Sequence, residues 1–374
     1  MALTAEQIAK QAGVSVATVS RVLNNSGRVS DDARQAVLEA IRASGAMPRL
    51  RGKRTGRRLK ERAGAGGVVE IVLVRSMPME MLEVRSGEYD VGAVGSLTID
   101  RFFAPNSRYA NSYYRRLVEG AVEELKRYGL RPHLRITNTL IGQQLAAQIN
   151  APAVKGLIIL GDYDANTEPF LASVRCPVVA LTTWEHQGWP DYVGIRNGRG
   201  IRLGFEHVRS LGHSKIGYVA GTQISAVFRE RFAAYRKLMA EAGLPYRAEW
   251  VAEGSNHIGE MYNQMLPILR LKDRPTAMLC SYDGAALAVH QAAERLGLSI
   301  PRQLSVVGFD DDEVGQLCQP PLTTVRVPAQ LMGRRAVQLL VLRKEGYEDD
   351  RSDGFSVRVM PELVVRHTTA APEP

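Results

Sequence analysis

The stretch from Gly13 to Asn24, GVSVATVSRVLN, carries a face whose residue types could read a DNA duplex. A helix here would bury an apolar stripe of Val19, Val22 and Leu23. The residues left outside are small or hydroxylated, with one cation: Val16, Ala17, Thr18, Ser20 and Arg21. Arginine pairs with guanine through two hydrogen bonds, small apolar side chains pack on thymine methyl groups, and hydroxyls donate to phosphate oxygens. The face therefore predicts a helix that enters the DNA major groove.

Three short helices would position this face. Thr4 matches the start of a capping box, Gly13 ends the first helix, and Ser15 can cap the second. Ser30 can cap a third helix beyond a loop rich in Asn, Ser and Gly. A helix, a tight corner with glycine and a second helix is the helix-turn-helix signature. The alternative is a three-helix protein–protein module in which the arginine is incidental.

Positive charge gathers at the same end of the chain. The 374 residues carry a formal net charge of +9. Residues 1–62 hold 13 Lys and Arg against 5 Asp and Glu, whereas residues 63–374 hold 35 against 34. A basic module on a nearly neutral body indicates a polyanionic partner at one end, and a solvated basic tail is the alternative.

Composition bounds the remaining classes. The three cysteines, Cys176, Cys280 and Cys318, have no paired spacing, so we expect neither a disulfide framework nor a metal site. The N-terminal residues MALTAEQIAK do not form a signal peptide, and no apolar run approaches the roughly 18 residues of a membrane span. The expectation is a cytoplasmic protein with no membrane partner.

From Val68 onwards, short apolar runs alternate with helical patterns, for example VEIVLV, GLIILGD, KIGYVAG and LSVVGFDD. Strands that are apolar at every residue are buried on both faces, which predicts α/β architecture with parallel sheets flanked by helices. Ligands of such sheets bind at the carboxyl ends of the strands. The polar or aromatic residues that follow these runs are Asp162, Trp184, Tyr282, Asp283, Asp310 and Asp311.

The segment IAKQAGVSVATVSRVLN, followed by VSDDAR, resembles the N-terminal signature of the lactose-repressor/galactose-repressor (LacI/GalR) family of bacterial transcription regulators. The resemblance implies a DNA-binding domain over residues 1–48. In that family the two residues after GVS and the arginine of TVSRVLN read bases, and here those places are held by Val16, Ala17 and Arg21. Asn24 completes the expected DNA-binding set of this helix.

Residues 49–67 are expected to form a basic hinge or linker, and here the chain departs from the family. The family follows its third helix with G-Y-x-P-N-x-x-A-R-x-L, whose leucine enters the minor groove. This chain has GAMPR instead, and Leu59 stands eleven residues after Pro48 where the family has seven. One hypothesis keeps Leu59 as the wedge, with Arg57 and its neighbours along the DNA. The other is a basic arm with no wedge.

The segments SLGHSKIGYVAG, LSVVGFDD, PPLTTV and PELVVRHTT resemble the family's effector-binding core, expected over residues 68–374. That core shares the fold of periplasmic sugar-binding proteins, with two lobes, three crossovers and a small effector between the lobes. By motif, the resemblance carries the effector-binding roles to Tyr113, Tyr114, Arg231 and Asp310. Tyr282 stands where many members have Asn, which points to a different effector.

The residues themselves fit a carbohydrate effector. A sugar ring presents an apolar face to aromatic side chains and hydroxyls to a carboxylate or guanidinium. The aromatic candidates are Tyr113, Tyr114, Trp184 and Trp250, and the polar candidates are Arg231, Asp283 and Asp310. Their ordinary alternatives are packing for the tyrosine pair and helix capping for an aspartate after a strand.

Residues 77–110 form an insertion relative to the family. Its strand-like alternation of residues predicts an extra hairpin at the dimer contact or the cleft mouth.

Enzymatic motifs are lacking: GRGIRLG at 198–204 only approximates a dinucleotide fingerprint, and no catalytic residue or cofactor is assigned. We therefore expect a repressor that binds a pseudo-palindromic double-stranded DNA operator as a homodimer under control of a small effector. The rival is a sugar-binding receptor with the same core that acts without DNA.

Overall fold

The computed structural model describes residues 5–23, 29–44, 67–74, 95–97, 112–137, 143–161, 167–182, 190–344 and 354–373. The chain forms two compact units. The first comprises Met1–Gly194 and Ala329–Arg358, and the second comprises Ile195–Pro328 and Val359–Pro374. The chain thus passes between the units three times, which agrees with the three crossovers implied by the family resemblance.

Three helices open the chain, α1 (Ala5–Ala12), α2 (Val16–Leu23) and α3 (Asp31–Ser44). Their shared core is formed by Ile8, Val19, Val22 and Val37, all of which are fully buried. Gly13 turns the corner between α1 and α2 with a φ of +65°, a conformation that glycine adopts without strain. These bounds confirm the helix-turn-helix prediction, while Thr4 of the expected capping box lies outside the described residues.

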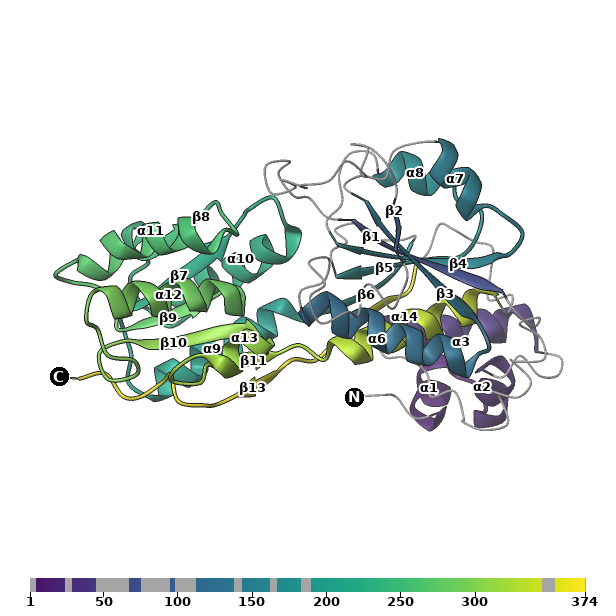
Figure 1. Cartoon of the computed structure of the whole chain (residues 1–374). Coiled ribbons are helices and arrows are strands. Elements are labelled where there is room, and N and C mark those ends of the chain that lie inside the picture. The colour runs from purple at the N-terminus through teal and green to yellow at the C-terminus, as the bar shows by residue number, and fades with distance from the viewer. Residues whose placement is uncertain are drawn as a thin grey trace. The chain divides into compact units, whose positions relative to one another are not determined.

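The first unit contains a seven-stranded sheet of order β12-β6-β5-β4-β1-β3-β2 (Figure 1). Its strands are β1 (Val68–Val74), β2 (Gly95–Leu97), β3 (Arg131–Thr137), β4 (Val154–Gly161), β5 (Val178–Thr182), β6 (Asp191–Ile195) and β12 (Ser356–Val359). The register along β3-β1-β4-β5-β6 is parallel, as the two-sided apolar runs predict. Of the predicted hairpin in residues 77–110, only β2 is described, and it pairs antiparallel with β3.

Helices cover both faces of this sheet. The helices are α6 (Ser112–Arg127), α7 (Gln143–Ile149), α8 (Thr167–Ser173) and α14 (Ala329–Lys344). Leu145 of α7 and Phe170 of α8 pack in one buried cluster with Val72 and Ile159 of the sheet. On the other face α6 and α14 lie side by side (Figure 1).

Glycines allow α6 and α14 to approach each other closely. A Cβ atom on Gly120 would lie 2.0 Å from the carbonyl oxygen of Gln330, and one on Gly333 would lie 2.0 Å from that of Leu117. Both obstacles are backbone atoms, which cannot rotate away. The two helices therefore touch backbone to backbone at this crossing.

We expect Gly120→Ala to lower the free energy of unfolding by about 3 kcal/mol, because the helices must separate to admit the methyl group. Differential scanning calorimetry of the whole chain checks this as a fall in the melting temperature. Gly259→Ala is the matched control on another helix, since a Cβ there meets nothing within 4 Å. An equal melting temperature for the two variants would contradict the close crossing.

The second unit contains a six-stranded sheet of order β13-β11-β10-β9-β7-β8. Its strands are β7 (Ile216–Gly221), β8 (Val251–Glu253), β9 (Ala277–Cys280), β10 (Ser305–Asp310), β11 (Thr323–Arg326) and the antiparallel edge strand β13 (Glu362–Val364). The helices are α9 (Asn197–Ser210), α10 (Ala226–Glu241), η2 (Ala248–Trp250), α11 (Ile258–Arg270), α12 (Asp283–Arg295) and α13 (Glu313–Leu317).

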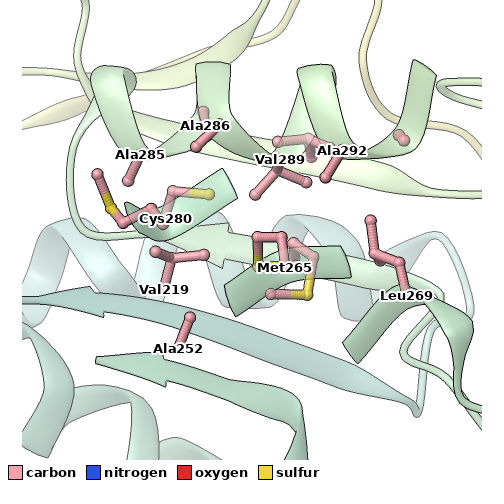
Figure 2. Packing of buried hydrophobic residues seen from close by; sticks show 14 of the residues in the cluster. Val219, Ala252, Met265, Leu269, Cys280, Ala285, Ala286, Val289 and Ala292 are labelled. Atoms are coloured by element: carbon pink, nitrogen blue, oxygen red, sulfur yellow. The ribbon is translucent and has the colours of Figure 1, made fainter. Parts of the chain in front are cut away.

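Alternating side chains on these strands pack against helices on opposite faces. Val219 of β7 and Cys280 of β9 point into a cluster with Met265 of α11 and Val289 of α12 (Figure 2). Small residues such as Ala286 line the inner face of α12 in this cluster. The opposite face carries α9 and α10, so the sheet is covered on both sides and its ligand-accessible residues lie at the strand ends.

Candidate functional site

The outward face of α2 is the first candidate site. Val16 is 44% exposed, which is unusual for a valine, and Ala17 and Arg21 are also exposed. Thr18 is half-buried, and its hydroxyl lies 2.9 Å from Oγ of Ser15. These residues lie opposite the buried Val19 and Val22, as predicted, and the side chain of Leu23 lies outside the described residues. The side chain of Ser20 and the whole of Asn24, Arg57 and Leu59 lie outside the described residues.

Ser15 fixes the start of this helix. Its Oγ accepts a hydrogen bond from the backbone N–H of Thr18 at 3.0 Å, as an N-cap residue does. Ser30 plays the same part for α3, where the N–H of Ala33 donates at 3.4 Å. The caps explain why both helices begin where the sequence predicts.

We expect Ser15→Ala to destabilise α2 by about 1 kcal/mol, because the first turn loses the partner of a backbone N–H. Amide hydrogen exchange of α2 checks this as roughly fivefold faster exchange at Val19 and Val22. Ser15→Asp restores a capping oxygen and should restore protection. Unchanged exchange in the alanine variant would show that the cap does not limit opening of the helix.

The second candidate site lies at the carboxyl ends of β7, β9 and β10 in the second unit, and Arg231 is its centre. Arg231 of α10 is only 3% exposed. Its Nε donates to Oδ1 of Asn197 at 2.9 Å, and its Nη1 donates to the carbonyl oxygen of Ser281 at 2.5 Å and to Oδ1 of Asp310 at 3.4 Å. The guanidinium also lies over the ring of Phe309, 3.6 Å from its centroid. Four partners thus hold this cation in one position.

Asp310 ends β10 in an uncommon backbone conformation. Its φ is +109° and that of Asp311 is +54°, and two consecutive non-glycine residues with positive φ carry strain. The side chain of Asp310 is 16% exposed, so it faces both Arg231 and solvent. Strain of this kind persists only where surrounding contacts impose it, and two buried aspartates supply those contacts.

Asp283 is the first of these aspartates. It is 1% exposed, and its carboxyl group accepts hydrogen bonds from Oγ1 of Thr324 and from the backbone N–H of Asp312, both at 2.6 Å. Burial, reinforced by the nearby charge of Asp310, raises the pKa of Asp283 well above its usual range. From the sequence, Asp283 was predicted to bind the effector. In the structure both of its carboxyl oxygens accept hydrogen bonds from the protein, so Asp283 holds the strained end of β10 in place.

Because the pKa of Asp283 is raised on folding, the native chain binds its proton more tightly than the unfolded chain does. The stability that Asp283 contributes is therefore fully present below about pH 4 and declines as the pH rises towards the folded-state pKa. We expect Asp283→Asn to flatten this decline, because the amide stays neutral and can donate to Thr324. Melting temperatures of both proteins from pH 4 to pH 8 check this. Parallel pH profiles would contradict it.

Asp311 is the second buried aspartate. It pairs with Nε of Arg326 at 2.7 Å and with Nη2 of Arg366 at 2.5 Å. Burial alone would raise the pKa of Asp311, but the hydrogen bonds from Arg366 and Arg326 outweigh it and hold this pKa below the usual range. Asp311 therefore stays charged and ties the end of β10 to β11 and to the segment after β13.

An aromatic pair stands beside Arg231. The rings of Tyr282 and Phe228 stack with centroids 5.5 Å apart and planes 29° apart, and both residues are half-buried. The hydroxyl of Tyr282 donates to the carbonyl oxygen of Asn256 at 2.9 Å. Phe228 is not among the site residues predicted from the sequence, although its position three residues before Arg231 places both on one face of α10.

The other aromatic candidates belong to other elements of the chain. Tyr113 and Tyr114 open α6 in the first unit, where both are half-buried with ring centroids 5.5 Å apart. Trp250 is 1% exposed and its indole N–H donates to the carbonyl oxygen of Asp273, so the expectation that it stacks on a ligand is wrong. Asp162 and Trp184 lie outside the described residues.

Three specific features are not found in the described part of the chain: a dinucleotide fingerprint, a metal cluster and a membrane-spanning helix. Residues 198–204, GRGIRLG, lie within α9 rather than in a loop between strand and helix, so they cannot cradle a pyrophosphate as a dinucleotide fingerprint does. Among the described residues no group of three or more His, Cys, Asp or Glu side chains could hold a metal ion. No described helix is long and apolar enough to span a membrane.

Comparison with known proteins gives matches to both parts of the chain. Residues 4–48 match the family "Bacterial regulatory proteins, lacI family", and residues 205–369 match the "Periplasmic binding protein-like domain". The HTH-type transcriptional repressor PurR of Mannheimia succiniciproducens is 26% identical over 372 residues, which is 97% of each chain. PurR of Haemophilus influenzae is also 26% identical over 97% of each chain.

Solved structures share the whole architecture. The transcriptional regulator CelR in complex with cellobiose superposes with a TM-score of 0.64 at 25% identity, over 98% of this chain and 99% of its own. The lac repressor dimer bound to operator and the anti-inducer ONPF gives a TM-score of 0.63 at 24% identity, over 99% and 100%. With its LacI-family helix-turn-helix domain and its periplasmic-binding-protein-like core, this chain is a DNA-binding transcriptional regulator similar to these repressors.

Proposed function

We propose that this protein is a cytoplasmic repressor that binds a pseudo-palindromic operator as a homodimer and responds to a small molecule bound by Arg231 and Asp310. The observation that carries the proposal is the outward face of α2, where Val16, Ala17 and Arg21 stand exposed on a capped helix. A two-fold dimer presents two such helices to successive major grooves on one side of DNA, which accounts for the symmetry of the operator.

Arg21 is the base reader with the greatest specificity in this proposal. A guanidinium bonds O6 and N7 of one guanine, whereas Val16 and Ala17 offer only apolar contacts suited to thymine methyl groups. The basic segment at residues 49–62 neutralises phosphates and adds affinity without reading sequence. Within it, Leu59 as a minor-groove wedge and Arg57 as its phosphate neighbour stay predictions, tested by DNA bending with Leu59→Ala.

The effector half of the proposal rests on Arg231 and Asp310. The carboxylate accepts and the guanidinium donates, a combination that grips adjacent hydroxyl groups. A carbohydrate or carbohydrate derivative is therefore the effector class that we propose. If the effector changes the affinity for operator by some factor, the operator changes the affinity for the effector by the same factor, because the two binding equilibria are linked.

Selection of bound fragments from genomic DNA tests the proposal. The full-length protein should enrich fragments that share one inverted repeat, and the affinity should fall with salt at a slope of about −0.9 per phosphate contacted. Genes beside the repeat would indicate the regulated process. Weak binding that ignores sequence would instead favour the rival function, a sugar-binding receptor with the same core that acts without DNA.

A further inference from the structure

Four planar groups neighbour one another in succession at the carboxyl end of the six-stranded sheet. The ring of Phe309 lies under the guanidinium of Arg231, Phe228 follows with its centroid 6.0 Å from the guanidinium carbon, and Tyr282 stacks on Phe228. Phe309 is fully buried, whereas Phe228 and Tyr282 are half-buried. The last two rings therefore have surface left for a ligand beside the cation.

Tyr282 contributes ring surface to this site and no free hydroxyl. Its Oη donates to the carbonyl oxygen of Asn256 and lies 3.7 Å from Sδ of Met261, so the hydroxyl is turned towards the α11 side. An asparagine at this place, as the family resemblance leads one to expect, would offer both an amide donor and an acceptor. The tyrosine thus exchanges hydrogen-bonding capacity for an apolar face.

The hydrogen-bonding groups that remain are few. Nη2 of Arg231 has no hydrogen-bond partner among the described residues, and the same is true of Nδ2 of Asn256, whose Oδ1 accepts from the N–H of Thr222. Asp310 adds a carboxylate, and the buried Oγ of Ser281 has no hydrogen-bond partner among the described residues. This set can hold the polar part of one ligand, and on the Phe228–Tyr282 side the group it offers is the amide of Asn256.

We propose that the effector carries an aromatic ring, which stacks on the Phe228–Tyr282 pair while a hydroxylated part is held by Arg231 and Asp310. The class is a sugar joined to an aryl group or to a nucleobase, and this inference rests on the effector site of the proposed function. Offset stacking of a third ring on an aromatic pair adds attraction beyond burial of apolar area. Phe228 and Tyr282 are thereby the residues that determine effector specificity.

Matched ligand pairs test the inference by isothermal titration calorimetry on the full-length protein. The pairs are phenyl and methyl β-D-glucopyranoside, phenyl and methyl β-D-galactopyranoside, and adenosine and methyl β-D-ribofuranoside. The two members of each pair share the same sugar, and only one of them carries an aromatic ring. We expect the aromatic member of at least one pair to bind about tenfold more tightly than its partner.

Substitutions separate stacking from a structural role. Tyr282→Phe keeps the ring and loses the bond to Asn256, and it should retain the aromatic preference. Tyr282→Leu and Phe228→Leu keep apolar volume without a stacking face, and each should reduce the preference to about twofold or less. Tyr246→Leu is the control, because Tyr246 is an exposed tyrosine that precedes β8 at the opposite end of the sheet.

The remaining outcomes overturn the inference. One such outcome is that the methyl glycosides bind as tightly as their aromatic partners and that this binding depends on Arg231. The proposed effector site would then stand, but the proposed stacking of an aromatic ring would be wrong. Failure of every aromatic probe to bind would also contradict the proposed stacking. Selection of an operator from genomic DNA is independent of these probes, so failure of the inference and failure of the proposed function are distinguishable.

Discussion

Replacing Arg21 with alanine is expected to abolish most of the sequence-specific affinity for the selected operator. A bidentate arginine–guanine pair contributes about 2 kcal/mol of discrimination, and the proposed homodimer would use it twice, so the expected loss is about 4 kcal/mol or roughly a thousandfold in Kd. Binding to unrelated DNA should change little, because it depends on phosphate contacts. Fluorescence anisotropy with operator and scrambled duplexes measures both affinities.

Two further variants make this expectation specific. Arg21→Lys keeps the charge and loses the fork of donors, so its operator affinity should fall between those of the wild type and the alanine variant. Arg199→Ala removes the same charge from an exposed position on α9, outside the helical module, and should leave operator affinity unchanged. If Arg21→Ala weakened operator and scrambled DNA equally, Arg21 would be a phosphate contact and the specificity would lie elsewhere on α2.

Local chemistry made the helical module predictable. The starts of α2 and α3 depend on caps that lie within three residues, Ser15 to Thr18 and Ser30 to Ala33. The buried strands were equally readable, because β4, β7 and β10 are apolar on both faces and end in a glycine or an aspartate. In each case the signal that predicts the element, a cap or an apolar pattern, lies within that element or its first flanking residue.

The candidate site was only partly predictable, because its residues acquire their roles from distant partners. An aspartate between a strand and a helix fits a ligand contact, a helix cap or a buried acceptor equally well. Asp283 becomes a buried acceptor only because Thr324, 41 residues later in the chain, donates a hydrogen bond to it. Trp250 shows the same limit, because a tryptophan that fills an interior position and one that stacks on a ligand have the same local sequence signal.

Arg231→Ala is expected to have the largest effect on the second unit. The substitution leaves Oδ1 of Asn197 and the carbonyl oxygen of Ser281 without their donor and deprives Asp310 of its counter-charge. Removing one member of a buried, hydrogen-bonded ion pair costs about 3 kcal/mol of unfolding free energy. The melting temperature should therefore fall by several degrees, and binding of any effector probe that the wild type takes up should be lost.

Comparison with other arginine substitutions shows whether the loss comes from the buried network or from charge alone. Arg202→Ala removes an exposed arginine that pairs with Glu241 on the surface, and such pairs contribute little because water and salt screen them. Arg231→Lys keeps the charge, but one ammonium cannot reproduce the planar donor set that spans Asn197, Ser281 and Asp310 or the stack on Phe309. We expect the lysine variant to lose probe binding while it recovers part of the stability, because a charge remains beside Asp310. Equal melting temperatures for Arg231→Ala and Arg202→Ala would mean that the guanidinium of Arg231 contributes to ligand binding and not to stability. Asp283 and Asp311 would then be sufficient to hold the strained end of β10 in place.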